Sequence, residues 1–329
     1  MSGKKTILVM RFSALGDVAM TVPVIREFLE QNPDVEILYL SRRKFKPLFE
    51  NIPNLSFYTA DFDNEHKGLG GLFKLAKELK SYDFDAIADL HNVLRTKILR
   101  QIISSKKKAS LNKGRKERKA LIRTENKIRK PIKPMPERYA DVFRNLGFVL
   151  DLSNRLTENP AEKENAVGIA PFAMYEGKMY PLDKIRSVAL KLAENGTQVY
   201  LFGGKNESAE LESWEKLNRN IKSVAGKFDL QEELEMIQNL KLMVSMDSAN
   251  MHLASLVGTR VISIWGNTHP FMGFLGYGQS MDDVIQDENM KERPTSVFGK
   301  ESKKAEKKDY FKTISVETIL EKIESAMKE

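Results

Sequence analysis

Short apolar runs alternate with longer amphipathic stretches along the first half of the chain. Residues 6–10, 35–40 and 86–90 are apolar runs bounded by polar or glycine-containing turns, as is typical of parallel strands buried on both faces. Between and after these runs, residues 22–31 and 137–146 have apolar positions at helical spacing. The alternation predicts an α/β domain with a doubly wound parallel sheet, which is covered by helices on both sides.

The same alternation restarts after a polar stretch at residues 154–165, where we expect a linker. The first domain is therefore predicted over residues 1–158 and the second over residues 159–329. A polar stretch at residues 282–308 is expected to be loop. In the second domain the pattern predicts strands at residues 167–170, 199–202, 242–245 and 261–264, and helices at residues 182–193, 249–256 and 316–327.

Composition excludes several classes of site. The 329 residues contain no cysteine, so disulfides, thiolate metal sites and cysteine nucleophiles are ruled out. The four histidines lie too far apart along the chain to form a zinc motif. No apolar run approaches 18 residues and no signal peptide pattern opens the chain, so we expect a soluble, cytoplasmic protein.

The positive charge is concentrated in one segment. The formal net charge is +8, yet residues 106–133 alone contain 13 Lys or Arg and two acidic residues, and the remainder has a charge of −3. An anionic partner should therefore contact this segment. It contains no Phe, Tyr or Trp on which bases could stack, so we do not expect nucleic acid. The alternatives are an anionic membrane surface, a phosphorylated glycolipid, and a solvated loop without a partner.

Several strand-end loops contain residues that could perform chemistry, because ligands bind beyond the carboxyl ends of parallel strands. Asp17 follows the first strand on a glycine turn and could act as a general base or simply cap a helix. Asp247 and His252 flank a predicted helix start, which could bind an anion or contain only a cap and a half-buried histidine. Lys178 could neutralise a leaving phosphate, although most lysines are simply solvated. The spacing of glycines around Asp17 does not fit a dinucleotide fingerprint, which argues against an oxidoreductase.

Taken together, these motifs resemble the ADP-heptose:lipopolysaccharide heptosyltransferases of glycosyltransferase family 9. The resemblance covers most of the chain and is weakest at residues 100–160 and 280–310. Ala249 stands where the family pattern has a glycine, and it would be strained if that position required a positive φ. The matching motifs are residues 11–18 with Pro23, 89–91 with Arg95, 178–181, 202–204 with Glu207, 247–254 and 265–270.

The resemblance implies a GT-B fold, with two Rossmann-like domains facing each other across a cleft and the last helix packing back on the N-terminal domain. It implies an inverting, metal-independent enzyme with no cofactor, which transfers heptose from ADP-heptose to a Kdo–lipid A type acceptor at the inner face of the cytoplasmic membrane. Asp17 would be the catalytic base and Lys178 would stabilise the departing diphosphate. Donor contacts would come from Gly203, Gly204, Glu207, Asp247, Ser248, Ala249, His252, Gly266 and Thr268. Acceptor contacts would come from Ser13, Gly16, His66, Lys67, His91 and Arg95.

Two alternatives remain open from the sequence. The protein could be a GT-B transferase that uses another nucleotide sugar. It could also be a non-catalytic protein that binds a phosphoglycan or nucleic acid through residues 106–133.

Overall fold

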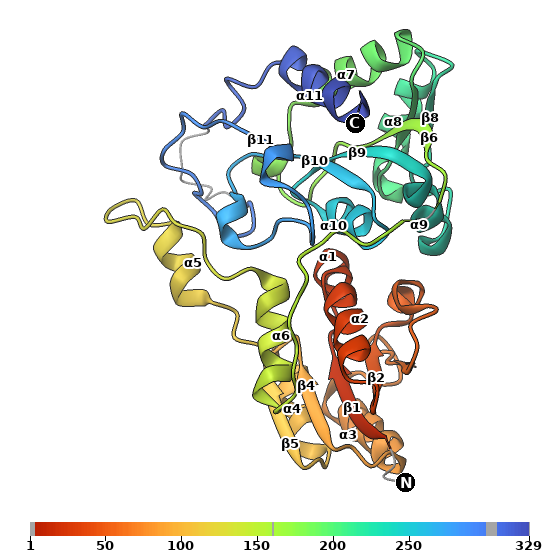
Figure 1. Ribbon diagram of the computed structural model, residues 1–329, viewed down its shortest axis with the longest axis vertical. Coiled ribbons are helices and arrows are strands. Elements are labelled where there is room, and N and C mark those ends of the chain that lie inside the picture. Colours follow the sequence, from red (N-terminus) through yellow and green to blue (C-terminus); the bar gives the residue numbers. More distant parts are fainter. Residues whose placement is uncertain (1–3, 160, 301–307, 329) are drawn as a thin grey trace. The chain divides into compact units, whose positions relative to one another are not determined.

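The computed structural model describes residues 4–159, 161–300 and 308–328; Pro160, within the predicted linker, lies outside them. The chain divides into two units (Figure 1), of which the first comprises Met1–Lys113 and Met135–Ser153. The second comprises Gly114–Pro134 and Asn154–Glu329. Most of the basic segment therefore groups with the second unit, whereas the sequence pattern placed it in the first domain.

The first unit is built on a five-stranded parallel sheet of order β3-β2-β1-β4-β5. In the central strand β1, the side chains of Ile7–Met10 are fully buried, as a strand covered on both faces requires. Leu8 and Met10 point into the core under α3 and α4, while α2 and α6 pack together through stacked rings of Phe28 and Phe143, 4.3 Å apart. The strands are β1 (Lys5–Met10), β2 (Val35–Ser41), β3 (Leu55–Thr59), β4 (Ala86–Asp89) and β5 (Lys107–Ser110). The helices are α1 (Leu15–Ala19), α2 (Thr21–Gln31), α3 (Gly68–Glu78), α4 (Leu94–Ile102) and α6 (Met135–Asn145), with 3-10 turns η1 (Arg43–Phe49) and η2 (Leu79–Ser81).

The second unit contains a six-stranded parallel sheet of order β11-β10-β9-β6-β7-β8, drawn in green to blue in Figure 1. The strands are β6 (Glu164–Ala170), β7 (Gln198–Leu201), β8 (Ile221–Ser223), β9 (Leu240–Met246), β10 (Arg260–Trp265) and β11 (Val284–Gln286). The helices are α5 (Arg115–Leu121), α7 (Leu182–Glu194), α8 (Ser208–Glu215), α9 (Leu230–Asn239), α10 (Ala249–Leu256) and α11 (Val316–Lys328). Short 3-10 turns are η3 (Glu176–Lys178), η4 (Lys205–Glu207), η5 (Pro270–Met272) and η6 (Met281–Asp283).

The terminal helix α11 completes the core of the second unit. Its apolar residues Ile319 and Ile323 are fully buried in one cluster with Val188 and Leu192 of α7. Lys191 and Glu317 add an exposed ion pair at 2.8 Å. The amphipathic stripe of α11 is thus covered within its own unit, while the expected packing of this helix on the N-terminal domain stays a prediction.

The predicted loop at residues 282–308 contains a further strand. Strand β11 pairs in parallel with β10, with Val284 opposite Ser263. It is only three residues long and is flanked by polar residues, so it has no periodic signal in the sequence. Residues 301–307 of this stretch lie outside the described residues.

Candidate active-site residues

The first group of candidate residues follows strand β1 in the first unit. Asp17 is the third residue of α1, and its Oδ2 lies 2.9 Å from a guanidinium nitrogen of Arg11. Arg11 is buried; it donates to the carbonyl of Leu90 at 2.6 Å and lies 5.4 Å from the ring centre of Tyr139. The carboxylate is thus fixed through one oxygen. Its side chain is still 32 % exposed, and Oδ1 has no hydrogen bond within the described residues.

Asp17 also makes a weak cap at the start of its helix. The backbone N–H of Ala14 donates to Asp17 Oδ2 at 3.4 Å, which is long for a capping hydrogen bond. The cap and the Arg11 contact use the same oxygen. Capping and a role as base therefore do not exclude each other.

His91 lies beside the same loop. Its Nδ1 accepts a hydrogen bond from the backbone N–H of Phe12 at 3.4 Å, and its Nε2 lies 3.5 Å from the hydroxyl of Ser13. Burial, together with Arg11 and Lys113, lowers the pKa of His91 to about 3. The ring is therefore neutral near pH 7, and with Nδ1 accepting, its proton is on Nε2. Ser13, Asp17 and His91 are brought together around Arg11.

The other predicted acceptor residues differ in their surroundings. Gly16 is part of α1, where its carbonyl accepts from the N–H of Met20 at 3.0 Å. Arg95 is exposed, and its guanidinium lies 5.3 Å from the ring centre of Phe62. Phe62 packs in turn on Phe12 at 4.5 Å, which connects Arg95 to the loop containing Ser13.

His66 has a structural environment. It is buried; its Nδ1 accepts from the backbone N–H of Asp61 at 2.9 Å, and its Nε2 lies 3.1 Å from Glu78 Oε2. Both ring nitrogens are therefore engaged within the loop and helix α3. The neighbouring Lys67 has an exposed side chain at the start of α3, so of these two residues Lys67 is the one available to a ligand.

The second group lies where β6, β9 and β10 end. Lys178 of η3 forms a 2.9 Å ion pair with Asp247 Oδ2, and both side chains are mostly buried. Thr268 donates its hydroxyl hydrogen to the same oxygen at 2.8 Å. Three residues that the sequence singled out in separate loops are thus joined at one edge of the sheet, as parallel strand order predicts.

The start of α10 adjoins this group. Ser248 precedes the helix, and its hydroxyl lies 3.2 Å from that of Ser245. Ala249 is the first helical residue and is not among the residues with positive φ in the described chain. An alanine here is therefore unstrained, and the strain anticipated for this departure from the family pattern is absent. His252 is buried one turn into the helix.

The glycine pair after β7 forms a tight turn. The backbone N–H of Gly204 donates to Glu207 Oε2 at 2.6 Å. A Cβ on Gly203 would lie 2.9 Å from the same oxygen, closer than side chains normally approach. These three residues are therefore held by one another at the end of the strand next to β6.

Arg293 is a structural residue of the site that the sequence analysis missed. It is fully buried and donates to the carbonyls of Gly266 (2.5 Å), Trp265 (3.0 Å) and Thr268 (2.8 Å). Burial lowers its pKa to about 10. Arg293 thus fixes the loop that positions Thr268. An arginine within a predicted polar loop, followed by proline, was the only signal in the sequence.

The basic segment has two parts with different roles. In the first unit, Lys106 pairs with Asp85 at 2.7 Å, while Lys107 and Lys108 donate to backbone carbonyls of Leu146 and Ile103. In the second unit, residues 114–134 are anchored by several contacts. The guanidinium of Arg118 lies 4.4 Å from the ring centre of Phe274, Lys127 donates to the carbonyls of Glu292 and Pro294 at 2.6 Å each, and the N–H of Ile132 donates to Phe271. The exposed cations in this second part are Arg115, Lys116, Lys119, Arg123, Lys130 and Lys133.

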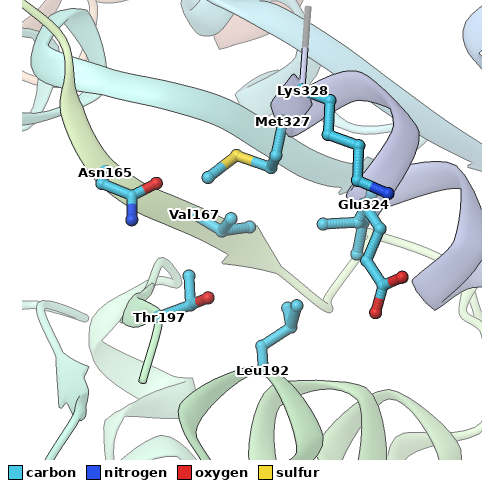
Figure 2. A pocket seen from close by; sticks show the side chains of 8 residues that line it. Asn165, Val167, Leu192, Thr197, Glu324, Met327 and Lys328 are labelled. Atoms are coloured by element: carbon cyan, nitrogen blue, oxygen red, sulfur yellow. The ribbon is translucent and has the colours of Figure 1, made fainter. Parts of the chain in front are cut away.

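A pocket of about 220 Å³ lies at the other end of the second sheet (Figure 2). It is lined by Asn165 and Val167 at the start of β6, by Leu192 of α7 and by Met327 of α11. It is therefore separate from the group at the strand ends. Within the part of the chain that the structure describes, no cluster of three or more His, Asp or Glu could hold a metal ion. No helix among the same residues is long and apolar enough to span a bilayer.

Comparison with known proteins assigns the family. The family model described as "Glycosyltransferase family 9 (heptosyltransferase)" matches residues 72–304, more than half of the chain. The chain belongs to this family. As a family member the protein is a glycosyltransferase, which confirms the predicted enzyme class.

Individual relatives agree with this assignment. The lipopolysaccharide core heptosyltransferase OpsX of Haemophilus influenzae is 24% identical over 340 residues, covering 96% of this chain and 95% of the relative. Lipopolysaccharide heptosyltransferase 3 of Escherichia coli is 26% identical over 281 residues, covering 77% and 80%.

Solved structures of family members share the fold. E. coli heptosyltransferase WaaC, solved with ADP-2-deoxy-2-fluoro heptose, matches with a TM-score of 0.72 at 15% identity, covering 97% of this chain and 99% of that one. A family 9 glycosyltransferase from Veillonella parvula also gives 0.72, at 19% identity and 99% and 98% coverage. These likenesses confirm the predicted GT-B fold.

Proposed function

We propose that this family 9 glycosyltransferase transfers heptose from ADP-heptose to a phosphorylated lipopolysaccharide inner-core acceptor of the Kdo–lipid A type, with inversion at the anomeric carbon. The observation that carries the proposal is the joined Lys178–Asp247–Thr268 group beside a helix N-terminus. The names of the relatives support heptose as the sugar and lipopolysaccharide as the acceptor.

On the donor side, Lys178 and the start of α10 would neutralise the diphosphate. A lysine ammonium and a helix N-terminus both favour negative charge, and that charge increases on the diphosphate as the sugar departs. Asp247, held by Lys178 and Thr268, would accept hydrogen bonds from donor hydroxyls. Further donor contacts would come from Ser248, Ala249, His252, Gly266, Gly203, Gly204 and Glu207.

On the acceptor side, Asp17 would be the general base. The acceptor oxygen forms a bond to the anomeric carbon while the bond from that carbon to the diphosphate oxygen breaks. The hydroxyl proton passes to Asp17 Oδ1, and the bonding pair leaves with ADP. A single displacement of this kind inverts the anomeric centre. Ser13, Gly16, His91, Arg95 and Lys67 would contact the acceptor.

We expect this chemistry to proceed without a metal ion, because Lys178 and the α10 N-terminus supply positive charge where a metal would otherwise act. Transfer should therefore persist in excess EDTA, measured as ADP release. Loss of activity in EDTA that returns on adding a divalent ion would contradict the metal-independent mechanism.

The exposed cations of residues 114–134 would contact acceptor phosphates and the anionic inner face of the cytoplasmic membrane. Positively charged segments near such a surface are attracted by its negative potential. We therefore propose that the enzyme acts on the cytoplasmic side as a peripheral membrane protein.

The decisive experiment is transfer from ADP-heptose to a Kdo-bearing lipid A acceptor, followed by mass spectrometry of the lipid. We expect a mass increase of one heptose residue. Calorimetry with a panel of nucleoside diphosphates tests the donor, and we expect ADP to bind most tightly. If another nucleoside diphosphate binds more tightly and its sugar is transferred, ADP-heptose is not the donor. If the protein binds the acceptor but transfers no sugar from any donor, the proposed transferase function is wrong and a binding function takes its place.

A further inference from the structure

Three separate segments of the second unit converge on Lys178. They are η3 itself, the loop at Gly266–Thr268 and the stretch at residues 295–299. Asn267 joins them: its backbone N–H donates to the carbonyl of Gly177 at 2.7 Å, and its side-chain amide donates to the carbonyl of Gly299 at 2.9 Å. Its own carbonyl accepts from the N–H of Thr295 at 2.9 Å. One fully buried asparagine thus links the loop before Lys178 to the stretch ending at Gly299.

Two glycines of these segments, Gly266 and Gly299, lie so close to neighbouring atoms that a side chain at either position would clash. A Cβ on Gly266 would lie 2.1 Å from the carbonyl oxygen of Gly177. A Cβ on Gly299 would lie 2.3 Å from both Cγ and Cδ of Lys178, well inside van der Waals contact. The backbone of Gly299 therefore lies directly against the middle of the lysine side chain.

This packing restricts a side chain that is otherwise flexible. A lysine has four rotatable bonds and loses considerable rotamer entropy when it is fixed. Here the middle of Lys178 rests on Gly299, and its ammonium lies 2.9 Å from Asp247. Asn267 donates to the carbonyl of Gly299, although its own buried Oδ1 has no hydrogen-bond partner within the described chain. A buried unsatisfied oxygen destabilises a fold, so this amide is not explained by stability alone.

We propose that Asn267 and Gly299 are positioning residues that hold Lys178 extended toward Asp247 and hence toward the donor diphosphate. This inference rests on the proposed function of Lys178. Gly299 limits where the side chain can lie, and Asn267 fixes Gly299 relative to the loop that precedes Lys178. A side chain added at position 299 should therefore weaken ADP binding when residue 178 is lysine. It should have no effect on ADP binding when that lysine is replaced by alanine.

The test is a double-mutant cycle on ADP binding, measured by isothermal titration calorimetry. Gly299→Ala should weaken ADP binding about 10-fold, because the added methyl group displaces Lys178. Gly299 has a φ of +90°, so the alanine is also strained. Gly196→Ala is the matched control, because Gly196 has a φ of +85° but no atom within 4 Å of the new Cβ. The control should introduce similar backbone strain without a steric clash and leave ADP affinity within about 2-fold.

The cycle separates the inference from the function on which it rests. Lys178→Ala removes the atoms that the new methyl would meet, so adding Gly299→Ala to it should change ADP affinity no further. If Gly299→Ala changes ADP affinity no more than Gly196→Ala does, the positioning role is wrong. It is also wrong if Gly299→Ala lowers ADP affinity equally in the presence and absence of Lys178. If Lys178→Ala itself leaves ADP affinity unchanged, the proposed role of Lys178 in donor binding is wrong instead.

A second variant covers the case in which Gly299→Ala does not fold. The hydroxyl of Ser296 accepts from the N–H of Gly299 and donates to the carbonyl of Lys300, each at 3.0 Å. Ser296→Ala therefore loosens Gly299 without adding an atom. We expect a loss of ADP affinity of about 3-fold that disappears in the Lys178→Ala background. No loss, or an equal loss in both backgrounds, would overturn the proposal.

Discussion

At the scale of single residues, Asp17 shows how one carboxylate can be fixed and still remain reactive. Arg11 holds Oδ2 at 2.9 Å, and burial of Arg11 keeps this partner in place. The other oxygen remains available to a hydroxyl proton. A base must lie within hydrogen-bond reach of the proton that it accepts, and a side chain fixed at one oxygen reaches such a position with little loss of entropy.

Asp17→Asn should abolish most turnover while ADP still binds. Asparagine keeps the shape of the side chain but cannot accept the proton, so kcat should fall by roughly 100- to 10,000-fold, the usual contribution of a general base. The measurement is heptose transfer at saturating donor, together with ADP affinity by calorimetry, which should change less than about 3-fold.

The control for this variant must also remove a carboxylate from an ion pair. Asp34→Asn is suitable, because Asp34 pairs with Lys5 at 3.2 Å on the exposed surface, where such pairs contribute little. It should leave kcat unchanged. The melting temperature of the Asp17→Asn variant should fall, because the buried Arg11 is left with a weaker partner. Full activity in Asp17→Asn would remove the residue as the base.

The sequence indicated some site residues well and others not at all. Lys178, Asp247 and Thr268 each follow a strand, and parallel strands end at one edge of the sheet, so their proximity could be predicted. Asn267, Arg293 and Gly299 act through contacts between a strand-end loop and residues 287–299. The path of that stretch is set by tertiary packing and has no periodic signal.

At the scale of elements, the sequence pattern predicted the interior strands of both sheets and missed the four edge strands. Length does not separate the two groups of helices, because α3 has eleven residues, as many as the predicted α2, and was not predicted. Residues 249–256 form α10 as predicted, and 182–193 is α7 to within one residue. The missed strands β3, β5, β8 and β11 have three to five residues. β5 reads Lys-Lys-Ala-Ser with two exposed lysines, and an edge strand with this sequence cannot be told from loop.

Helix α5 turns part of the basic run into an ordered surface. Arg118 packs on Phe274 and Leu121 is buried, whereas Arg115, Lys116 and Lys119 are exposed. Phe298, 60 % exposed, lies 6.4 Å from Phe274 between ring centres. The surface thus combines exposed cations with a nearby exposed aromatic ring.

Replacing Arg115, Lys116 and Lys119 together by glutamine should weaken binding to anionic vesicles. Each cation near such a surface contributes about 1 kcal/mol, so the loss should approach 100- to 200-fold for three. The measurement is cosedimentation with vesicles of phosphatidylglycerol and phosphatidylethanolamine at low salt. ADP affinity should stay unchanged, because none of the three residues is among the donor contacts.

The matched control removes three exposed cations from elsewhere in the second unit, namely Lys216, Arg219 and Lys312. It changes the net charge equally but should lower vesicle binding far less. Equal losses in the two triple variants would show that net charge, not the α5 surface, attracts the protein to membranes.

At the scale of the whole molecule, the chain passes between the two units more than once. Residues 114–134 join the second unit, and residues 135–153 return to the first. The sequence pattern could not show this, because a basic stretch without apolar periodicity gives no indication of which core it packs against. The 13 Lys and Arg residues of the basic segment are therefore divided between lysines that stabilise the first unit and cations displayed by the second.

Stability of the whole protein should decrease in mild acid. Burial, with Arg293 and Arg129, lowers the pKa of His269 to about 3, against about 6.5 in the unfolded chain. Between these values only the unfolded state binds the proton. His269 therefore contributes stability above pH 6.5 that is lost as the pH falls toward 3, by up to about 1.4 kcal/mol per pH unit. The same direction holds for His91.

His269→Asn isolates this contribution. The Nδ1 of His269 accepts from the N–H of Phe271 at 3.1 Å, and the amide oxygen of asparagine can accept that bond without titrating. Between pH 7.5 and pH 5, the free energy of unfolding in urea should therefore fall by about 2 kcal/mol less in the variant than in the original protein. Because the carboxylates titrate equally in both, an identical pH dependence would mean that His269 binds its proton equally in the folded and unfolded states.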